Sequence, residues 1–140
     1  MLLSEWALLG FVVWTIALVV VGIGVTRITQ IITKQARANS FNPSVPHGSE
    51  RYQRSMRAHV NCVENLPIFA ALVLLGSAHA MTGWQFQAAA FAVLPARVLQ
   101  SSVHIWSGRN RAVLVRFVFF LLQVACFLTM ASLLAARGLR

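Results

Sequence analysis

The sequence contains few charged residues and very few acidic ones. Only 11% of its 140 residues are charged, whereas a soluble domain of this size would carry about 25%. Three acidic residues stand against twelve lysines and arginines, which gives a formal net charge of +9. Hydrophobic residues make up 58% of the chain, and its mean hydropathy is +0.70. This composition excludes an ordinary soluble domain and indicates a membrane protein.

Cysteine is also scarce. Cys62 and Cys126 are the only two, and no Cys-x-x-Cys spacing occurs. The sequence therefore indicates neither a metal site nor a disulfide framework. Both cysteines lie in apolar stretches, where we interpret them as small buried side chains.

Four apolar stretches each approach the ~20 residues that cross a bilayer as a helix. They cover approximately residues 6–26, which could continue to 32, and residues 60–82, 86–103 and 112–136. No lysine or arginine precedes the first stretch, and Glu5 lies there instead, so we expect a retained helix and not a cleavable signal peptide. We predict an all-α membrane protein in which residues 1–140 form one domain, a bundle of four transmembrane helices.

The basic residues predict the orientation of this bundle. They lie mainly around the first and third connections, namely Arg27, Lys34, Arg37, Arg51, Arg54, Arg57, Arg109, Arg111 and Arg116. The turn between the second and third stretches has none. By the positive-inside bias, both basic loops face the cytoplasm and both termini face the other side. Because no soluble fold presents these arginines, we expect membrane lipids with anionic headgroups as partners, and no nucleic acid.

The first loop, residues 33–55, contains Pro43, Pro46 and Gly48. These residues exclude a continuous helix. The segment is long enough to fold over the cytoplasmic mouth of the bundle, and it could equally be a simple linker. The sequence leaves both interpretations open.

The second apolar stretch begins with polar residues at helical spacing. Arg57, Asn61 and Glu64 stand at i, i+4 and i+7, so they share one face of a helix. With a rise of ~1.5 Å per residue, Glu64 lies roughly 10 Å further along the axis than Arg57. A carboxylate at that depth is costly unless it is paired or functional, which makes Glu64 a candidate site residue.

The third stretch repeats this pattern with Arg97, Gln100 and His104 at i, i+3 and i+7. Since this helix runs back towards the cytoplasm, Arg97 lies at a depth similar to that of Glu64. We predict that the two form an ion pair, because each alone would be an uncompensated charge in hydrocarbon. The fourth stretch adds Arg116 near its cytoplasmic end.

Together these side chains predict one polar site near the cytoplasmic face, with Lys34 and Arg37 contributed from the loop side. A mostly cationic site with one carboxylate suits an anionic ligand that has several carboxylates and one amino group. Arginine binds carboxylates through two parallel hydrogen bonds, and an arginine beside a thiol favours the reactive thiolate. The competing interpretation is that these groups only hold the helices together.

The motifs resemble those of a known family. The pattern Arg57-x-His59-x-Asn61-x-x-Glu64-Asn65-x-Pro67 is similar to the signature of the MAPEG family, the membrane-associated proteins of eicosanoid and glutathione metabolism. Two further patterns are similar to its bacterial branch: Arg97-x-x-Gln100-Ser-x-x-His104 and Arg116-Phe-x-Phe-Phe. The resemblance extends from about residue 51 to the C-terminus, and the first helix matches only in character.

The resemblance implies a homotrimer that binds glutathione, as a co-substrate, in a cleft between neighbouring subunits near the cytoplasmic face. It implies a glutathione transferase or peroxidase of the bacterial inner membrane that acts on lipophilic electrophiles or hydroperoxides. Arg116 would stabilise the thiolate, with His104 as a helper. The glutathione-binding candidates are Arg57, Asn61, Glu64, Lys34, Gln100 and Arg97.

Two departures from the family pattern keep an alternative open. Many animal members have a tyrosine where this chain has His104, and the only tyrosine here is Tyr52, in the first loop. Arg111 is a rival for Arg116, although Arg116 lies deeper in its helix. The alternative is a non-catalytic membrane protein of the same fold that binds an anionic lipid or a partner protein. A small transporter is less favoured, because no glycine-interrupted half-helices occur.

Overall fold

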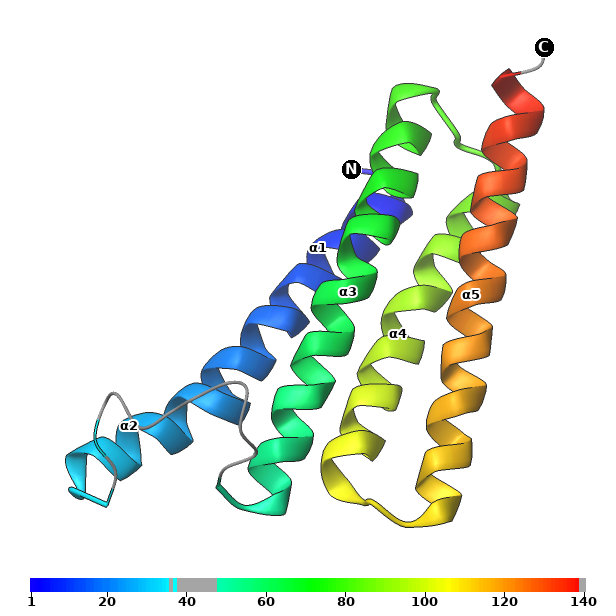
Figure 1. The fold of residues 1–140 in the computed structure, drawn as a ribbon. Helices are drawn as coiled ribbons and strands as arrows, with labels where there is room; N and C mark the ends of the chain where they lie inside the picture. Colours follow the sequence, from blue (N-terminus) through cyan, green and yellow to red (C-terminus); the bar gives the residue numbers. More distant parts are fainter. Residues whose placement is uncertain (36, 38–47, 139–140) are drawn as a thin grey trace.

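The computed structural model describes residues 1–35, 37 and 48–138 (Figure 1). Its elements are α1 (Leu3–Ala17), the π-helical segment η1 (Leu18–Gly24), α2 (Val25–Ile32), α3 (Glu50–Ala78), α4 (Trp84–Trp106) and α5 (Asn110–Gly138). The first three form one continuous span, Leu3–Ile32. Within the described residues, four helices are long and apolar enough to cross a membrane, and no strand occurs. The predicted all-α fold with four membrane helices is confirmed.

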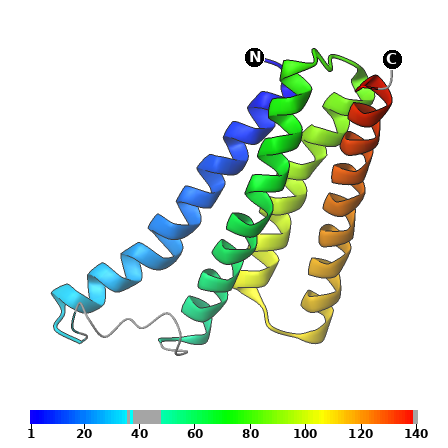
Figure 2. The ribbon, with the colours of Figure 1, turned by 45° about the horizontal axis from the view of Figure 1, so that its top comes forward.

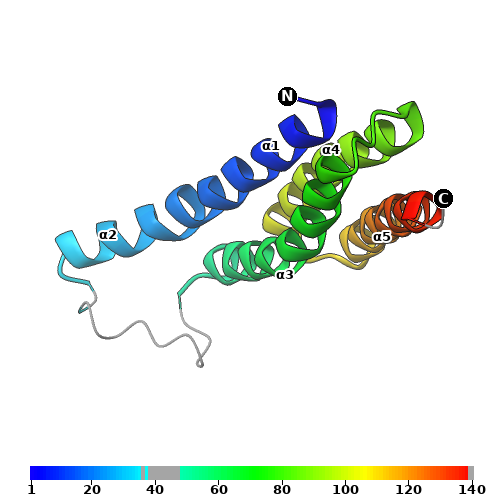
Figure 3. The ribbon, with the colours of Figure 1, turned by 90° about the horizontal axis from the view of Figure 1, so that it is seen from above.

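The four long helices lie side by side, and α4 contacts each of the other three (Figures 1 and 2). Seen from above, the end of α2 runs outward from the rest of the bundle (Figure 3). The start of α1 and the end of α5 lie at the same end of the bundle (Figure 1). The start of α3, with Arg51, Arg54 and Arg57, and the turn between α4 and α5, with Arg109, lie at the opposite end.

The core joins the helices through aromatic rings. The ring centroids of Phe11 on α1 and Phe69 on α3 are 5.6 Å apart, and those of Phe69 and Phe127 on α5 are 6.0 Å apart. All three rings are buried, and Val93 of α4 packs in the same cluster. Tilted ring pairs at these distances are favourable. In lipid, where exclusion of water does not drive helices together, such close packing is a main source of stability.

Helix α3 begins ten residues earlier than the predicted apolar stretch. Ser49 caps it, because the Ser49 hydroxyl accepts a hydrogen bond from the Tyr52 backbone N–H at 3.2 Å, and Glu50 occupies the first turn. Both features stabilise a helix start. The predicted first loop, 33–55, is therefore wrong at its end, since its last residues are helical. The suggested cover over the bundle mouth falls on residues 38–47, which lie outside the described residues.

Two glycines allow close approach between helices. A Cβ atom on Gly22 of η1 would lie 3.3 Å from Cβ of Ser55 on α3. A Cβ atom on Gly76 of α3 would overlap the ring of Phe86 on α4. Phe86 is buried, so its ring has little freedom to move away. Small residues at such crossings are typical of membrane helices.

Replacing Gly76 with valine should therefore destabilise the bundle. We expect a cost of about 1–3 kcal/mol, because the added methyl groups overpack a buried crossing. The measurement is the midpoint of thermal unfolding of the purified protein in detergent, followed by circular dichroism. Ala78→Val is the matched control, because Ala78 is exposed near the end of the same helix. Equal midpoints for the two variants would contradict this packing.

Candidate functional site

Four of the predicted site residues lie around one hollow. Asn61 of α3, Gln100 and His104 of α4, and Arg116 of α5 line a hollow of about 280 Å³. Val113, Phe117 and Phe120 of α5 complete the lining. The structure thus brings together polar side chains from three helices at an open surface. Their roles in binding and catalysis remain predictions.

A hydrogen-bonded network fixes one wall of this hollow. The Gln100 side-chain amide donates to the backbone carbonyl of Arg116 at 3.0 Å. Gln123 donates to the Gln100 side-chain oxygen at 3.0 Å and to the backbone carbonyl of Phe119 at 2.9 Å. Gln123 is fully buried, with 0% of its surface exposed. These bonds join α4 to α5 beside Arg116 and set how the two helices are rotated against each other.

Sequence reasoning missed Gln123, although a signal for it was present. Gln123 stands seven residues after Arg116 in an otherwise apolar stretch. At 3.6 residues per turn, seven residues return to nearly the same face of a helix. A polar residue on the face of the candidate arginine could therefore have been connected to the site.

Arg57 and Glu64 lie about one turn to either side of Asn61 on α3, and both are exposed. Neither forms an ion pair with another residue in the part of the chain that the structure describes. Glu64 therefore presents a carboxylate on the outer surface of a membrane-spanning helix. Such a group is costly in contact with lipid, so this face requires a polar partner.

The predicted ion pair between Arg97 and Glu64 is wrong. Arg97 is only 1% exposed, and its guanidinium carbon lies 5.5 Å from the ring centroid of Phe11 on α1. A cation over an aromatic face is attracted by the ring. The side chain therefore lies against α1, while Glu64 lies on the exposed side of α3, and Arg97 does not line the hollow.

The surroundings of Arg97 are buried and polar. The Ser101 hydroxyl donates to the Arg97 backbone carbonyl at 2.7 Å, and the sulfur of Cys62 lies 3.6 Å from the same hydroxyl. Nε and Nη2 of Arg97 have no hydrogen-bond partner in the described structure. The two cysteines are both buried and free, which agrees with their interpretation as small core residues.

The remaining basic candidates lie apart from the hollow. Lys34 is exposed in the turn just after α2, with a left-handed backbone (φ 57°), and the end of α2 runs away from α4 and α5. Arg37 is exposed. Arg111 is exposed in the first turn of α5 and does not line the hollow, whereas the half-buried Arg116 does. Of the two arginines, only Arg116 therefore lies where the predicted role could be tested at the hollow.

The only tyrosine lies elsewhere. Tyr52 is buried, and Nε of Arg27 donates to its hydroxyl at 2.7 Å. This bond ties α2 to the start of α3. Tyr52 therefore does not line the hollow, to which α4 contributes Gln100 and His104.

Replacing Gln123 with leucine should destabilise the protein and loosen the hollow. The substitution leaves the Gln100 side-chain oxygen without its donor, and an unpaired buried polar group costs about 1–3 kcal/mol. We expect a lower midpoint of thermal unfolding in detergent. Gln85→Leu is the control, because Gln85 is exposed at the start of α4. If these hydrogen bonds contribute little to stability, both variants will have the unfolding midpoint of the wild-type protein, which would contradict the prediction.

Comparison with known proteins identifies the family. The model of the MAPEG family matches residues 6–136 of the 140. No curated protein and no solved structure matches the chain. The match covers nearly the whole sequence, including almost all of the four membrane-spanning helices and every residue of the hollow. The chain therefore belongs to the MAPEG family.

Proposed function

We propose that this protein is a glutathione-dependent membrane enzyme, a transferase or peroxidase for lipophilic electrophiles or hydroperoxides. The observation that carries the proposal is the convergence of Asn61, Gln100, His104 and Arg116 on one open hollow. Membership of the MAPEG family, which includes glutathione-dependent transferases and peroxidases, supports it.

Each residue has a role suited to the chemistry of glutathione, which carries two carboxylates, one ammonium group and one thiol. Arg57 binds a carboxylate through paired hydrogen bonds, Glu64 receives the ammonium group, and Asn61 donates or accepts a hydrogen bond between them. Arg116 lies where its positive charge favours the thiolate. His104 donates a hydrogen bond to the sulfur or acts as a base.

The thiolate then attacks the second substrate. In conjugation, the sulfur forms a bond to an electrophilic carbon and the leaving group departs with the electron pair of its bond. In peroxide reduction, the sulfur takes the terminal oxygen of the hydroperoxide, releasing an alcohol, and a second glutathione converts the sulfenic acid to the disulfide and water. The exposed rings of Phe117 and Phe120, whose centroids are 6.4 Å apart, border the hollow and suit an apolar substrate.

A neighbouring subunit completes the site. Arg57 and Glu64 are exposed on α3, and Lys34 lies two residues beyond the outward-running end of α2. A homotrimer covers the exposed face of α3 with the helices of the next subunit, so that Lys34 and Arg37 of one chain approach the hollow of another. Arg97 supports the bundle from inside and does not bind glutathione directly.

The protein lies in the bacterial inner membrane with the site towards the cytoplasm and both termini on the opposite side. Arg51, Arg54, Arg57 and Arg109 lie at one end of the bundle, and the start of α1 and the end of α5 lie at the other, which supports this orientation. Glutathione enters from the cytoplasm, and the lipophilic substrate enters from the bilayer.

Glutathione binding is tested by titration calorimetry on the protein purified in detergent. Glu64→Gln should weaken binding roughly tenfold or more, because a hydrogen bond between charged groups contributes about 1.5–3 kcal/mol. Glu50→Gln is the matched control, since Glu50 is an exposed carboxylate at the start of the same helix, paired with Arg54 at 3.1 Å. A folded wild-type protein that binds no glutathione would favour the non-catalytic alternative.

The role of Arg116 is tested by steady-state kinetics with a lipophilic electrophile. Arg116→Gln should lower kcat roughly tenfold or more, because a fixed positive charge beside a developing anion is lost. The ultraviolet absorbance of bound thiolate should fall in parallel, while glutathione affinity changes less. Arg111→Gln, on the same helix, should retain both signals. Equal losses of kcat and affinity in Arg116→Gln would refute its assignment to the thiolate.

A further inference from the structure

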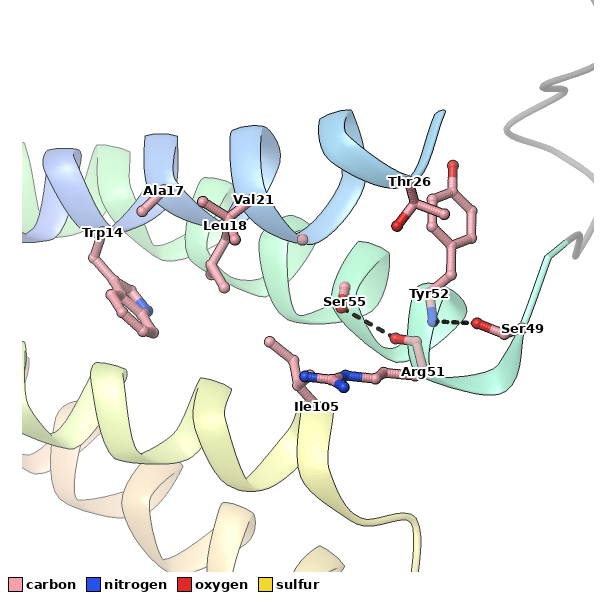
Figure 4. A pocket seen from close by; sticks show the side chains of 11 residues that line it. Trp14, Ala17, Leu18, Val21, Thr26, Ser49, Arg51, Tyr52, Ser55 and Ile105 are labelled. Carbon is pink, nitrogen blue, oxygen red and sulfur yellow. Dashed lines mark hydrogen bonds between the residues drawn. The ribbon is translucent and has the colours of Figure 1, made fainter. Parts of the chain in front are cut away.

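A second hollow lies on another face of the bundle, between the first membrane span and the start of α3 (Figure 4). Its volume is about 450 Å³. Trp14, Ala17, Leu18 and Val21 form an apolar wall that runs along α1 and η1. We call it the α1–α3 groove. It shares no residue with the hollow around Arg116.

The basic end of the bundle closes one end of the groove. Arg51, Tyr52 and Ser49 line it there, and Ile105 contributes from α4 (Figure 4). A further space of about 540 Å³, lined by Arg51 and Ile105 together with Arg54, Ser102 and Trp106, adjoins it. The groove therefore leads from an apolar interior to a cationic mouth.

The length of the groove matches one lipid leaflet. Its lining extends along the first span from Trp14 to Thr26, which is ~18 Å at ~1.5 Å per residue. Half of the ~30 Å hydrocarbon layer is about 15 Å. One acyl chain, lying parallel to the helices, would thus extend along the groove from its mouth to about the middle of the membrane.

Arg51 is the available cation at the mouth. Its side chain is exposed, and it has no ion-pair partner among the described residues. Arg54, by contrast, is held: Nη1 pairs with Glu50 at 3.1 Å, and Nε donates to the Ile105 carbonyl at 3.1 Å. Figure 4 shows the Arg51 guanidinium reaching towards Ile105 at the mouth of the groove.

The mouth lies at the level of the lipid headgroups. Trp106, at the end of α4, is 86% exposed beside it, and exposed tryptophan is typical of the boundary between hydrocarbon and water. Arginines at this level attract anionic headgroups by about 1 kcal/mol each. An apolar channel below an unpaired arginine is complementary to an acyl chain below a phosphate.

We propose that the α1–α3 groove binds one anionic phospholipid, with its phosphate at Arg51 and one acyl chain along Leu18 and Val21. The lipid fills the space that the outward course of the first span leaves against α3 and α4. This site goes beyond the proposed glutathione chemistry and does not depend on it, since the two hollows use different residues.

The test uses tryptophan quenching by lipids with brominated acyl chains. A protein with Trp14 as its only tryptophan (Trp6→Phe, Trp84→Phe, Trp106→Phe) is reconstituted in phosphatidylcholine vesicles. Brominated phosphatidylglycerol or brominated phosphatidylcholine then replaces part of the lipid at equal mole fraction. A protein with Trp6 as its only tryptophan is the control, because Trp6 is 56% exposed on the same helix and reports on bulk lipid.

We expect phosphatidylglycerol to displace phosphatidylcholine at Trp14 with a relative affinity of roughly fivefold or more, and to show no such preference at Trp6. Arg51→Gln should remove the preference, while Arg109→Gln, an exposed arginine at the same end of the bundle, should keep it. Ala17→Phe should fill the groove and reduce quenching of Trp14, whereas Ala125→Phe, on the exposed side of α5, should not.

Three results would overturn the proposal. The first is equal quenching of Trp14 by the two lipids, the second is an Arg51→Gln variant that keeps the preference, and the third is weak quenching by both lipids. Weak quenching would mean that protein, for example a segment of a neighbouring subunit, occupies the groove. Circular dichroism of each variant verifies that it is folded before its quenching is compared.

Discussion

The hydrogen bond between Gln123 and Gln100, 3.0 Å long and buried between α5 and α4, joins two membrane-spanning helices. Polar side chains at such depth bond to one another or to backbone carbonyls, since hydrocarbon offers nothing else. Here both glutamines also bond to carbonyls of α5. The rotation of α4 against α5 is thereby fixed, and with it the position of His104 and Arg116 around one hollow. The arrangement of the side chains in the candidate site therefore depends on the hydrogen bonds of these two glutamines.

Much of the fold could be predicted from the sequence, because hydropathy and the length of a helix that crosses a bilayer are strong constraints. The four spans and the grouping of Asn61, Gln100, His104 and Arg116 follow from them and from helical periodicity. The start of α3 could not be predicted in this way, because its first turns are polar and depend on the cap at Ser49. Hydropathy identifies the apolar part of a helix that lies in the membrane, and it does not identify polar turns that extend the helix beyond it.

The position of Arg97 shows where periodicity fails. Spacing places a residue within a sector of a helix, but α4 has three neighbouring helices, so a long side chain in that sector can turn towards any of them. Arg97 lies over the ring of Phe11 of α1 and forms no ion pair with Glu64 of α3. Which neighbour it contacts depends on how closely the helices pack, which spacing along one helix does not reveal. Depth along the membrane was therefore not sufficient to identify a partner for Arg97.

The arginines at the start of α3 connect the two hollows. Arg51, Arg54 and Arg57 are three residues apart, and each step of three turns the side chain by about 60° around the helix. Arg51 thus faces the α1–α3 groove, Arg57 faces the exposed side with Asn61 and Glu64, and Arg54 between them is fixed to Glu50 and to the Ile105 carbonyl. In the two proposals, Arg51 binds a lipid phosphate and Arg57 binds a carboxylate of glutathione. Arg54, between them, anchors the start of α3 to α4 through its hydrogen bond to the Ile105 carbonyl.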